Sequence, residues 1–325
     1  VAASAAIAFV PTYESIGIAA PTIRVLSRLR PGFAVGGEFG SATAFLAEQD
    51  PARRGYFASW QFASQALTGL LAAGFAAALT MLLSADEISA WAWRLPFMFG
   101  LLLYPIGIYI RGNLTETPEF LAAQLKSGPL RLTVHWRAFA LAIGLIVLGT
   151  VAVYTIIFLP TYAVRSLHLP AADGYITGVI TAVLQLALIP MFGALSDRIG
   201  RTPAPIAAAV AMLLGAWPAL AWLAGDPSFT KLVVLQMLLG VATAAYLGAM
   251  PALLAELFPV RARSTGLSIS YAFGVAVFGG LAPLVHAWLI MWTGNPAAPA
   301  IYLAAAALVS LVALLVARGM GPHKS

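Results

Sequence analysis

The chain has 325 residues, of which 61% are hydrophobic and 9% are charged, and its formal net charge is +6. An ordinary soluble domain carries about 25% charged residues, so this composition excludes a water-soluble globular protein. The absence of cysteine excludes disulfides, thiol catalysis and cysteine-ligated metals. The basic residues are scattered through the chain, which argues against a nucleic-acid-binding face.

Long apolar runs recur along the chain, and each can cross a ~30 Å hydrocarbon core as a helix. Their continuous, non-alternating pattern argues against a membrane β-barrel and predicts an all-α membrane protein. The first run, at roughly 1–11, predicts only a partial helix. Complete helices are predicted at 19–47, 56–83, 93–111, 138–163, 173–194, 203–224, 230–255, 265–291 and 299–317.

The breaks between these runs alternate in charge. One set of breaks holds twelve of the eighteen basic residues, and the positive-inside rule places that set and the C-terminus in the cytoplasm. The longest polar break, 112–137, belongs to this set. It predicts a central cytoplasmic loop between a partial helical bundle at 1–111 and a six-helix bundle at 138–325.

A short acid–proline–arginine signal occurs twice, 208 residues apart (256 minus 48), each time at the end of an apolar run. The copies comprise Glu48, Pro51, Arg53 and Gly55, and then Glu256, Pro259, Arg261, Arg263 and Gly266. Such a duplication predicts a transporter built from two repeated halves. The counterpart of Asp197, which precedes Glu256 by 59 residues, would fall before residue 1. We therefore expect a fragment of a twelve-helix protein that lacks its first two helices and most of the third.

Several motifs carry a family resemblance. The loop Gly193–Arg201 resembles the major facilitator superfamily signature Gly-x-x-x-Asp-Arg-x-Gly-Arg, and the string Arg28-x-x-x-Gly32-x-x-x-Gly36 matches that superfamily's fourth-helix pattern. The strings Gly36-Gly37-Glu38 and Trp93–Phe97 resemble the metabolite:proton symporter family within it. Other stretches look closest to citrate and tricarballylate symporters, namely Ser59-Trp60-Gln61, Ala216–Leu220 and Gly248–Leu253. The resemblance implies a two-bundle fold and proton symport of a small organic anion by alternating access.

Arg28 shares one helix stripe with Gly32, Gly36 and Gly40, which repeat every fourth residue and predict close helix packing. An arginine within a span usually faces a cavity or a partner, so Arg28 is a candidate for binding a carboxylate or for coupling to protons. The alternative is that it snorkels to the membrane surface. The candidate substrate contacts are Arg28, Gln61, Gln65, Tyr154, Gln185 and Tyr246, and bonding between helices is the alternative for the uncharged ones.

Glu38 is the one acidic residue placed well inside a predicted span, which makes it a candidate proton-coupling carboxylate. A structural ion pair is the alternative. Oppositely charged residues recur in the predicted cytoplasmic breaks and are candidates for a gate that breaks when the halves rock apart. The alternative is that they only anchor the loops by the positive-inside rule. They are Glu48, Arg53, Arg54, Asp197, Arg198, Arg201, Glu256, Arg261 and Arg263.

No Gly-Lys-Ser/Thr phosphate loop is present to support an ATP-driven pump, and no serine–histidine–acid set indicates an enzyme. The four histidines, which include His286 near a span end, are not spaced as metal ligands and are expected to be solvated or interfacial. We therefore expect no cofactor, metal, nucleotide or nucleic-acid partner. The sequence indicates a monomeric secondary transporter of the bacterial inner membrane, with protons, a di- or tricarboxylate such as citrate, and lipid as partners. Alternatives are proline, betaine, 2-oxoglutarate or shikimate as substrate, and a non-functional truncated fragment.

Overall fold

The computed structural model describes residues 9–10, 13–102, 104–113 and 136–319, without the side chains of 13–14, 21, 24–36, 104, 110–111 and 113. All regular elements within this part are helices, which confirms the predicted all-α fold. Before the central segment they are α2 (Tyr13–Ile16), α3 (Ala19–Ala47), a 3-10 turn (Pro51–Arg53), α4 (Arg54–Leu82), α5 (Ala85–Ala90), a 3-10 turn (Ala92–Arg94), α6 (Leu95–Leu102) and α7 (Tyr104–Asn113).

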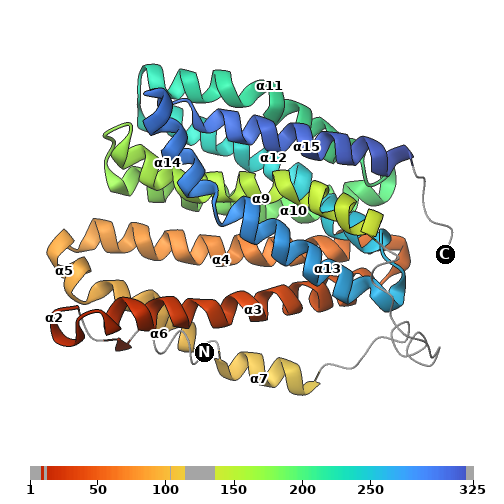
Figure 1. Cartoon of the computed structure of the whole chain (residues 1–325), viewed down its shortest axis with the longest axis horizontal. Coiled ribbons are helices and arrows are strands. Elements are labelled where there is room, and N and C mark those ends of the chain that lie inside the picture. The colour runs from red at the N-terminus through yellow and green to blue at the C-terminus, as the bar shows by residue number, and fades with distance from the viewer. Residues whose placement is uncertain (1–8, 11–12, 103, 114–135, 320–325) are drawn as a thin grey trace.

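The helices after the central segment form a second group. They are α9 (Trp136–Arg165), α10 (Ala171–Ile199), α11 (Pro203–Gly225), α12 (Phe229–Glu256), α13 (Val260–Gly274), a π-helical turn (Val275–Gly279), α14 (Ala282–Thr293) and α15 (Pro299–Gly319). The two groups lie in separate layers, with α3 and α4 below α9, α11, α12 and α15 in Figure 1. We call them the first and second bundles. They meet chiefly where α10 packs on α4 and α13 packs on α3.

Helix boundaries follow from local chemistry. Pro203 occupies the first turn of α11, where its missing N–H costs no hydrogen bond. The Ser228 hydroxyl accepts from the Lys231 amide at the start of α12, and Gly294 ends α14 in the left-handed conformation. Ser84 and Glu87 form a reciprocal capping box that starts the short helix α5 after the membrane-length α4.

Seven described helical stretches are long and apolar enough to cross a membrane, including Pro51–Leu82 and Val260–Thr293. The sequence predicted nine complete spans, and two of them are not among the seven. The expected helix 19–47 is present as α3, but it carries three arginines and Glu38 and is less apolar. The expected helix 93–111 is a 3-10 turn followed by the separate helices α6 and α7. Residues 114–135 of the predicted central loop lie outside the described part.

The predicted helix 265–291 is also interrupted. Its first part, α13, ends in the π-helical turn, where the Gly280 amide donates to the Val275 carbonyl five residues back, and α14 begins at Ala282. A Cβ atom at Gly279 would collide with Thr150 and the Tyr154 ring on α9. Glycine at this position therefore lets the irregular turn approach α9 closely.

Small residues let the two bundles touch. A Cβ atom at Gly55 of α4 would collide with Gly193 of α10, and one at Gly193 would collide with Ser59. A Cβ atom at Gly40 of α3 would collide with Ser264 and Ser268 of α13. Gly40 thus packs closely as its stripe predicts, while the side-chain surroundings of Gly32 and Gly36 lie outside the described residues. All these contacts bring the bundles together at the end of the helices where α13 begins.

Candidate functional site

Charged side chains from both bundles meet at the end of the molecule where α13 begins. We call Glu48, Asp197, Arg201, Glu256 and Arg263 the ion-pair cluster. Glu48 lies at the end of α3 and begins the first acid–proline–arginine loop, and Glu256 ends α12 and begins the second. Both repeated loops therefore lie at the same end of the helices.

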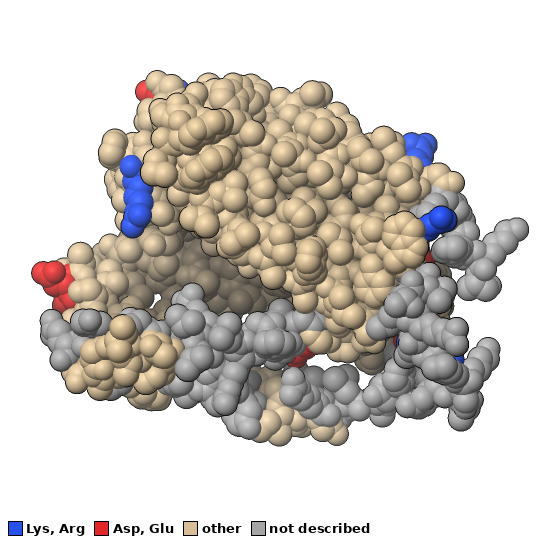
Figure 2. Space-filling view, in the orientation of Figure 1, with Lys and Arg blue, Asp and Glu red and all other residues tan. Residues whose placement is uncertain are grey.

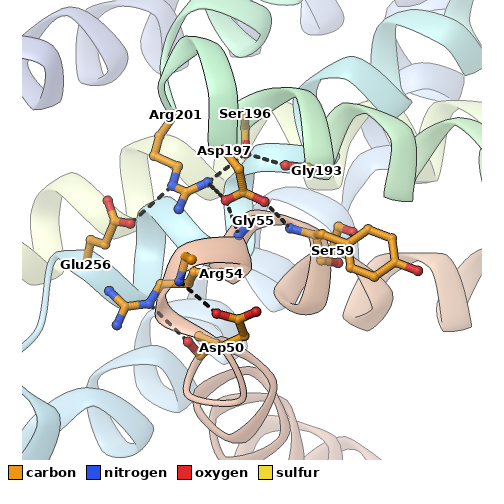
Figure 3. Close-up of polar contacts among 12 residues, drawn as sticks. Asp50, Arg54, Gly55, Ser59, Gly193, Ser196, Asp197, Arg201 and Glu256 are labelled. Atoms are coloured by element: carbon orange, nitrogen blue, oxygen red, sulfur yellow. Dashed lines mark hydrogen bonds and ion pairs between the residues drawn. The ribbon is translucent and has the colours of Figure 1, made fainter.

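The Asp197 carboxylate of α10 caps a helix of the other bundle (Figure 3). Its oxygens accept from the backbone amides of Gly55 at 2.8 Å and Tyr56 at 2.9 Å, in the first turn of α4. These amides have no partner within their own helix, and the positive end of the helix dipole favours a carboxylate there. Arg201 lies 2.5 Å from the same carboxylate and 3.1 Å from Glu256, so it links α10 to α12 within the second bundle.

A second contact between the bundles joins the two repeats. The Arg263 guanidinium donates to the Glu48 carboxylate at 2.7 Å and to the Ala255 carbonyl at 3.0 Å. The side chains of Arg263 and Glu48 are only 7% and 4% exposed. Because each buried charge depends on the other, separating the bundles here requires water to reach both groups.

The other predicted gate residues lie around this cluster. Arg54 donates to the Ala47 carbonyl at 3.0 Å and ties α4 to the end of α3. Arg53 lies over the Tyr56 ring at 4.8 Å. The residues Arg198 and Arg261 are exposed. Of the nine predicted residues, the structure therefore brings five into the ion-pair cluster and places four at its rim.

A cavity of about 910 Å³ lies between the bundles. Residues from α3, α4, α9, α10, α12 and α13 line it. The closely packed ion-pair end lies beyond it along the helices, toward the start of α13. In Figure 2 the surface is hollowed between the two layers toward the α5 end. The volume matches that of sites for small molecules, which span roughly 300–1,000 Å³.

Four of the six predicted substrate contacts line this cavity, namely Gln61, Gln65, Tyr154 and Gln185. The predicted proton-coupling residue Glu38 also lines it and is the only charged residue among the described lining residues. The Gln185 side chain is buried, and its amide nitrogen has no hydrogen-bond partner within the described part of the chain. A buried donor without a partner is costly, so a ligand acceptor at this position would be favourable.

Tyr246 is not among the residues that line the cavity, and the Arg28 side chain is not described. Tyr246 is fully buried away from the cavity, and its hydroxyl donates to the Leu145 carbonyl at 2.7 Å. That bond fixes α12 to α9 inside the second bundle. The Arg28 side chain lies outside the described residues.

Sequence reasoning missed an aromatic cluster in the cavity wall, formed by Phe39, Phe62 and Tyr271. The rings of Phe39 on α3 and Tyr271 on α13 are stacked, with centroids 3.4 Å apart and planes 3° from parallel. The Tyr271 hydroxyl also lies 3.4 Å from the Gln65 amide nitrogen. Aromatic residues are spread through all the apolar runs, so no spacing in the sequence marked these three.

His286 also differs from expectation. Its side chain is fully buried in the second bundle, and Nε2 lies 3.0 Å from the Thr155 hydroxyl. Because that hydroxyl donates to the Val151 carbonyl, it accepts from Nε2 and holds the ring as the Nε2–H tautomer. Among the described residues, no group of three or more potential metal ligands occurs.

Comparisons with known proteins agree with this architecture. The Major Facilitator Superfamily family profile matches residues 141–324, and the Sugar (and other) transporter profile matches residues 1–128. The chain is 36% identical over 313 residues to a citrate-proton symporter of Klebsiella pneumoniae, covering 94% of this chain and 70% of that protein. It is 35% identical to the glycine betaine/proline/ectoine/pipecolic acid transporter OusA of Dickeya dadantii, covering 94% of this chain and 64% of OusA.

Among solved structures, a double-tryptophan mutant of XylE superposes with a TM-score of 0.69. It is 18% identical and covers 98% of this chain and 77% of the XylE chain, so it supports the fold. The family profile covers more than half of the chain, and its span coincides with the second bundle. The chain belongs to the major facilitator superfamily, and it is a multi-pass membrane transport protein rather than an enzyme.

Proposed function

We propose that this chain is a proton-coupled symporter that imports a small organic anion, a di- or tricarboxylate such as citrate, across a bacterial inner membrane. The observation that carries the proposal is a cavity between two bundles whose closed end is held by contacts across the bundles. In such proteins the bundles rock around a fixed central site, so opening one end and closing the other moves the ligand. The citrate-proton symporter relatives supply the substrate class.

The ion-pair end would face the cytoplasm, together with the C-terminus, because most basic residues of the breaks belong to it. The structure then corresponds to an outward-facing state, closed toward the cytoplasm. Opening inward requires the Glu48–Arg263 pair and the Asp197 cap to separate. We expect the transporter to work as a monomer surrounded by lipid.

A carboxylate needs hydrogen-bond donors and a cation. Gln185 and Gln65 offer amide donors in the cavity, and Tyr154 offers a hydroxyl. We assign the cation to Arg28. Position 28 lies eleven residues before Phe39 on the continuous helix α3, about three turns away on the same face. Phe39 lines the cavity, so the assignment of Arg28 rests on the helical periodicity of α3.

A specific observation favours a second substrate class, the compatible solutes proline and betaine. The aromatic cluster and Glu38 lie in one cavity wall, and together they suit a positively charged nitrogen. The relative OusA is named as a transporter of glycine betaine, proline, ectoine and pipecolic acid. Other carboxylates such as 2-oxoglutarate or shikimate would use the same donors as citrate.

Uptake into proteoliposomes under an imposed inward proton gradient tests the proposal. Labelled citrate should accumulate, unlabelled citrate should compete, and a protonophore should abolish accumulation. Arg28→Gln should remove citrate uptake, whereas Arg318→Gln, at an exposed position outside the candidate gate, serves as the control. Betaine or proline accumulation without citrate uptake would establish the second class. If none of these compounds accumulates, either another carboxylate is the substrate, which uptake of labelled 2-oxoglutarate or shikimate would reveal, or the chain is inactive by itself.

A further inference from the structure

Gln65 and Tyr271 form a polar contact between the bundles in which both residues line the cavity. Gln65 belongs to α4 of the first bundle and Tyr271 to α13 of the second. The Gln65 amide nitrogen and oxygen lie 3.4 and 3.5 Å from the Tyr271 hydroxyl. We call this pair the cavity contact.

The cavity contact lies one layer inside the ion-pair cluster. Tyr271 follows Arg263 by eight residues on α13, Phe39 precedes Glu48 by nine, and Gln65 follows Gly55 by ten. At 1.5 Å per helical residue these separations are about 12, 13.5 and 15 Å. Along all three helices the cavity contact therefore lies at a similar distance from the ion-pair end. The intervening layer is closed by Gly40 packed against Ser264 and Ser268. The cavity contact is thus the inner boundary of the closed end.

The contact is weak enough for a ligand to replace it. Both separations are at the long limit for a hydrogen bond, so this pair holds less tightly than the 2.7 Å bond between Arg263 and Glu48. The amide and the hydroxyl are both donors once they release each other. A carboxylate oxygen can accept from both at once, which would join the two bundles through the ligand.

Because of its aromatic ring, Tyr271 can pass the effect of ligand binding on to the helix packing. It stacks on Phe39 of α3, so a displacement of Tyr271 also acts on the packing of α13 against α3. The same two helices carry Arg263 and Glu48 at the ion-pair cluster. Ligand binding in the cavity and closure of the ion-pair end therefore both depend on how α13 packs against α3.

We propose that Tyr271, together with Gln65, binds the carboxylate of the ligand and couples ligand binding to release of the ion-pair end. This inference rests on the proposed transport function. It applies to citrate and to betaine alike, because both carry a carboxylate. Tyr271→Phe keeps the stacked ring and removes only the hydroxyl, which makes it the informative substitution.

The absence of native cysteine permits a direct test. A single cysteine at Ala73, which lines the cavity on α4, is labelled in inside-out vesicles with an impermeant maleimide applied at the ion-pair end. Without ligand, Tyr271→Phe and Gln65→Leu should each raise the labelling rate about fivefold, the equivalent of ~1 kcal/mol for one hydrogen bond. Tyr162→Phe is the matched control, since it removes a hydroxyl that bonds the Pro296 carbonyl within the second bundle.

Adding citrate or betaine should raise the labelling rate of the parent protein and leave that of Tyr271→Phe unchanged. A thermal unfolding midpoint equal to that of the parent verifies that each variant is folded. Equal labelling of parent and Tyr271→Phe, under conditions where Glu48→Gln raises it, would overturn the proposal. If the labelling rate of the parent responds to neither compound, the role of Tyr271 in binding the ligand carboxylate would be overturned. Failure of the proposed transport function gives a different result. The parent then shows no uptake, while the difference in ligand-free labelling between the parent and Tyr271→Phe remains.

Discussion

Arg263 on α13 donates to Glu48 at the end of α3, so the second copy of the repeated acid–proline–arginine loop is joined directly to the first. The bond is 2.7 Å long and both side chains are buried. A buried ion pair is poor evidence of net stability, but removing one partner takes away the opposite charge that the other partner faces. This asymmetry makes the pair a suitable lock for one state of a transporter.

Loss of the Glu48 charge should open the ion-pair end. Glu48→Gln leaves the Arg263 guanidinium buried without its carboxylate, at a cost of about 3–5 kcal/mol to the closed state. Cysteine accessibility from that end should rise and the midpoint of thermal unfolding should fall. The double variant Glu48→Arg with Arg263→Glu should recover part of both properties. No recovery, combined with unchanged accessibility in Glu48→Gln, would show that the pair does not hold the end closed.

Asp197 is expected to act through its charge as well as its hydrogen bonds. Asp197→Asn retains one acceptor oxygen for the amides of Gly55 and Tyr56 but loses the interaction with the helix dipole and with Arg201. Uptake should fall in Asp197→Asn and fall further in Asp197→Ala. Arg318→Gln, at an exposed position outside the candidate gate, provides the control for a charge change. Wild-type uptake in Asp197→Ala would exclude a role for this cap in the transport cycle.

Gly40 and Gly74 offer a contrast between two glycines of the first bundle. A Cβ atom at Gly40 would collide with Ser264 and Ser268, whereas at Gly74 nothing lies within 4 Å. Gly40→Ala should therefore lower the unfolding midpoint and weaken transport, because α3 and α13 are pushed apart. Gly74→Ala should leave both unchanged or raise stability, since alanine favours a helix by about 1 kcal/mol over glycine. Equal unfolding midpoints for the two variants would contradict the close packing at Gly40.

Gln185 should matter for the ligand and not for folding. Its buried amide nitrogen has no partner in the described structure, so Gln185→Met removes an unsatisfied donor and should preserve or raise thermal stability. The KM for uptake should rise about tenfold, which corresponds to ~1.4 kcal/mol of lost binding. A large loss of stability with unchanged KM would identify Gln185 as a structural residue instead.

Glu38 should carry the pH dependence of uptake if it moves the proton. Glu38→Gln cannot exchange a proton, so uptake driven by a proton gradient should be lost while exchange of external for internal substrate persists. Asp86→Asn, which alters an exposed carboxyl outside the cavity lining, is the comparison variant. Unchanged pH dependence in Glu38→Gln would assign coupling to another group.

Much of this protein was determined by its sequence alone. The apolar runs predicted the membrane helices because lipid leaves the backbone no other partner than itself. The repeated loop predicted that Glu48 and Glu256 lie at one end, since equivalent loops of repeated halves share a membrane face. The Asp197 loop and the fourth-helix glycines marked the family, which the comparisons confirmed.

The tertiary structure decided which side chains face the ligand. Tyr154 and Tyr246 look equivalent in sequence, yet one lines the cavity and the other bonds the Leu145 carbonyl inside the second bundle. Tyr271 became a candidate only when α13 was seen to stack on Phe39 of the other bundle. Helical periodicity tells which residues of one helix share a face, but it does not tell which helix that face meets. That information comes from packing between segments more than two hundred residues apart.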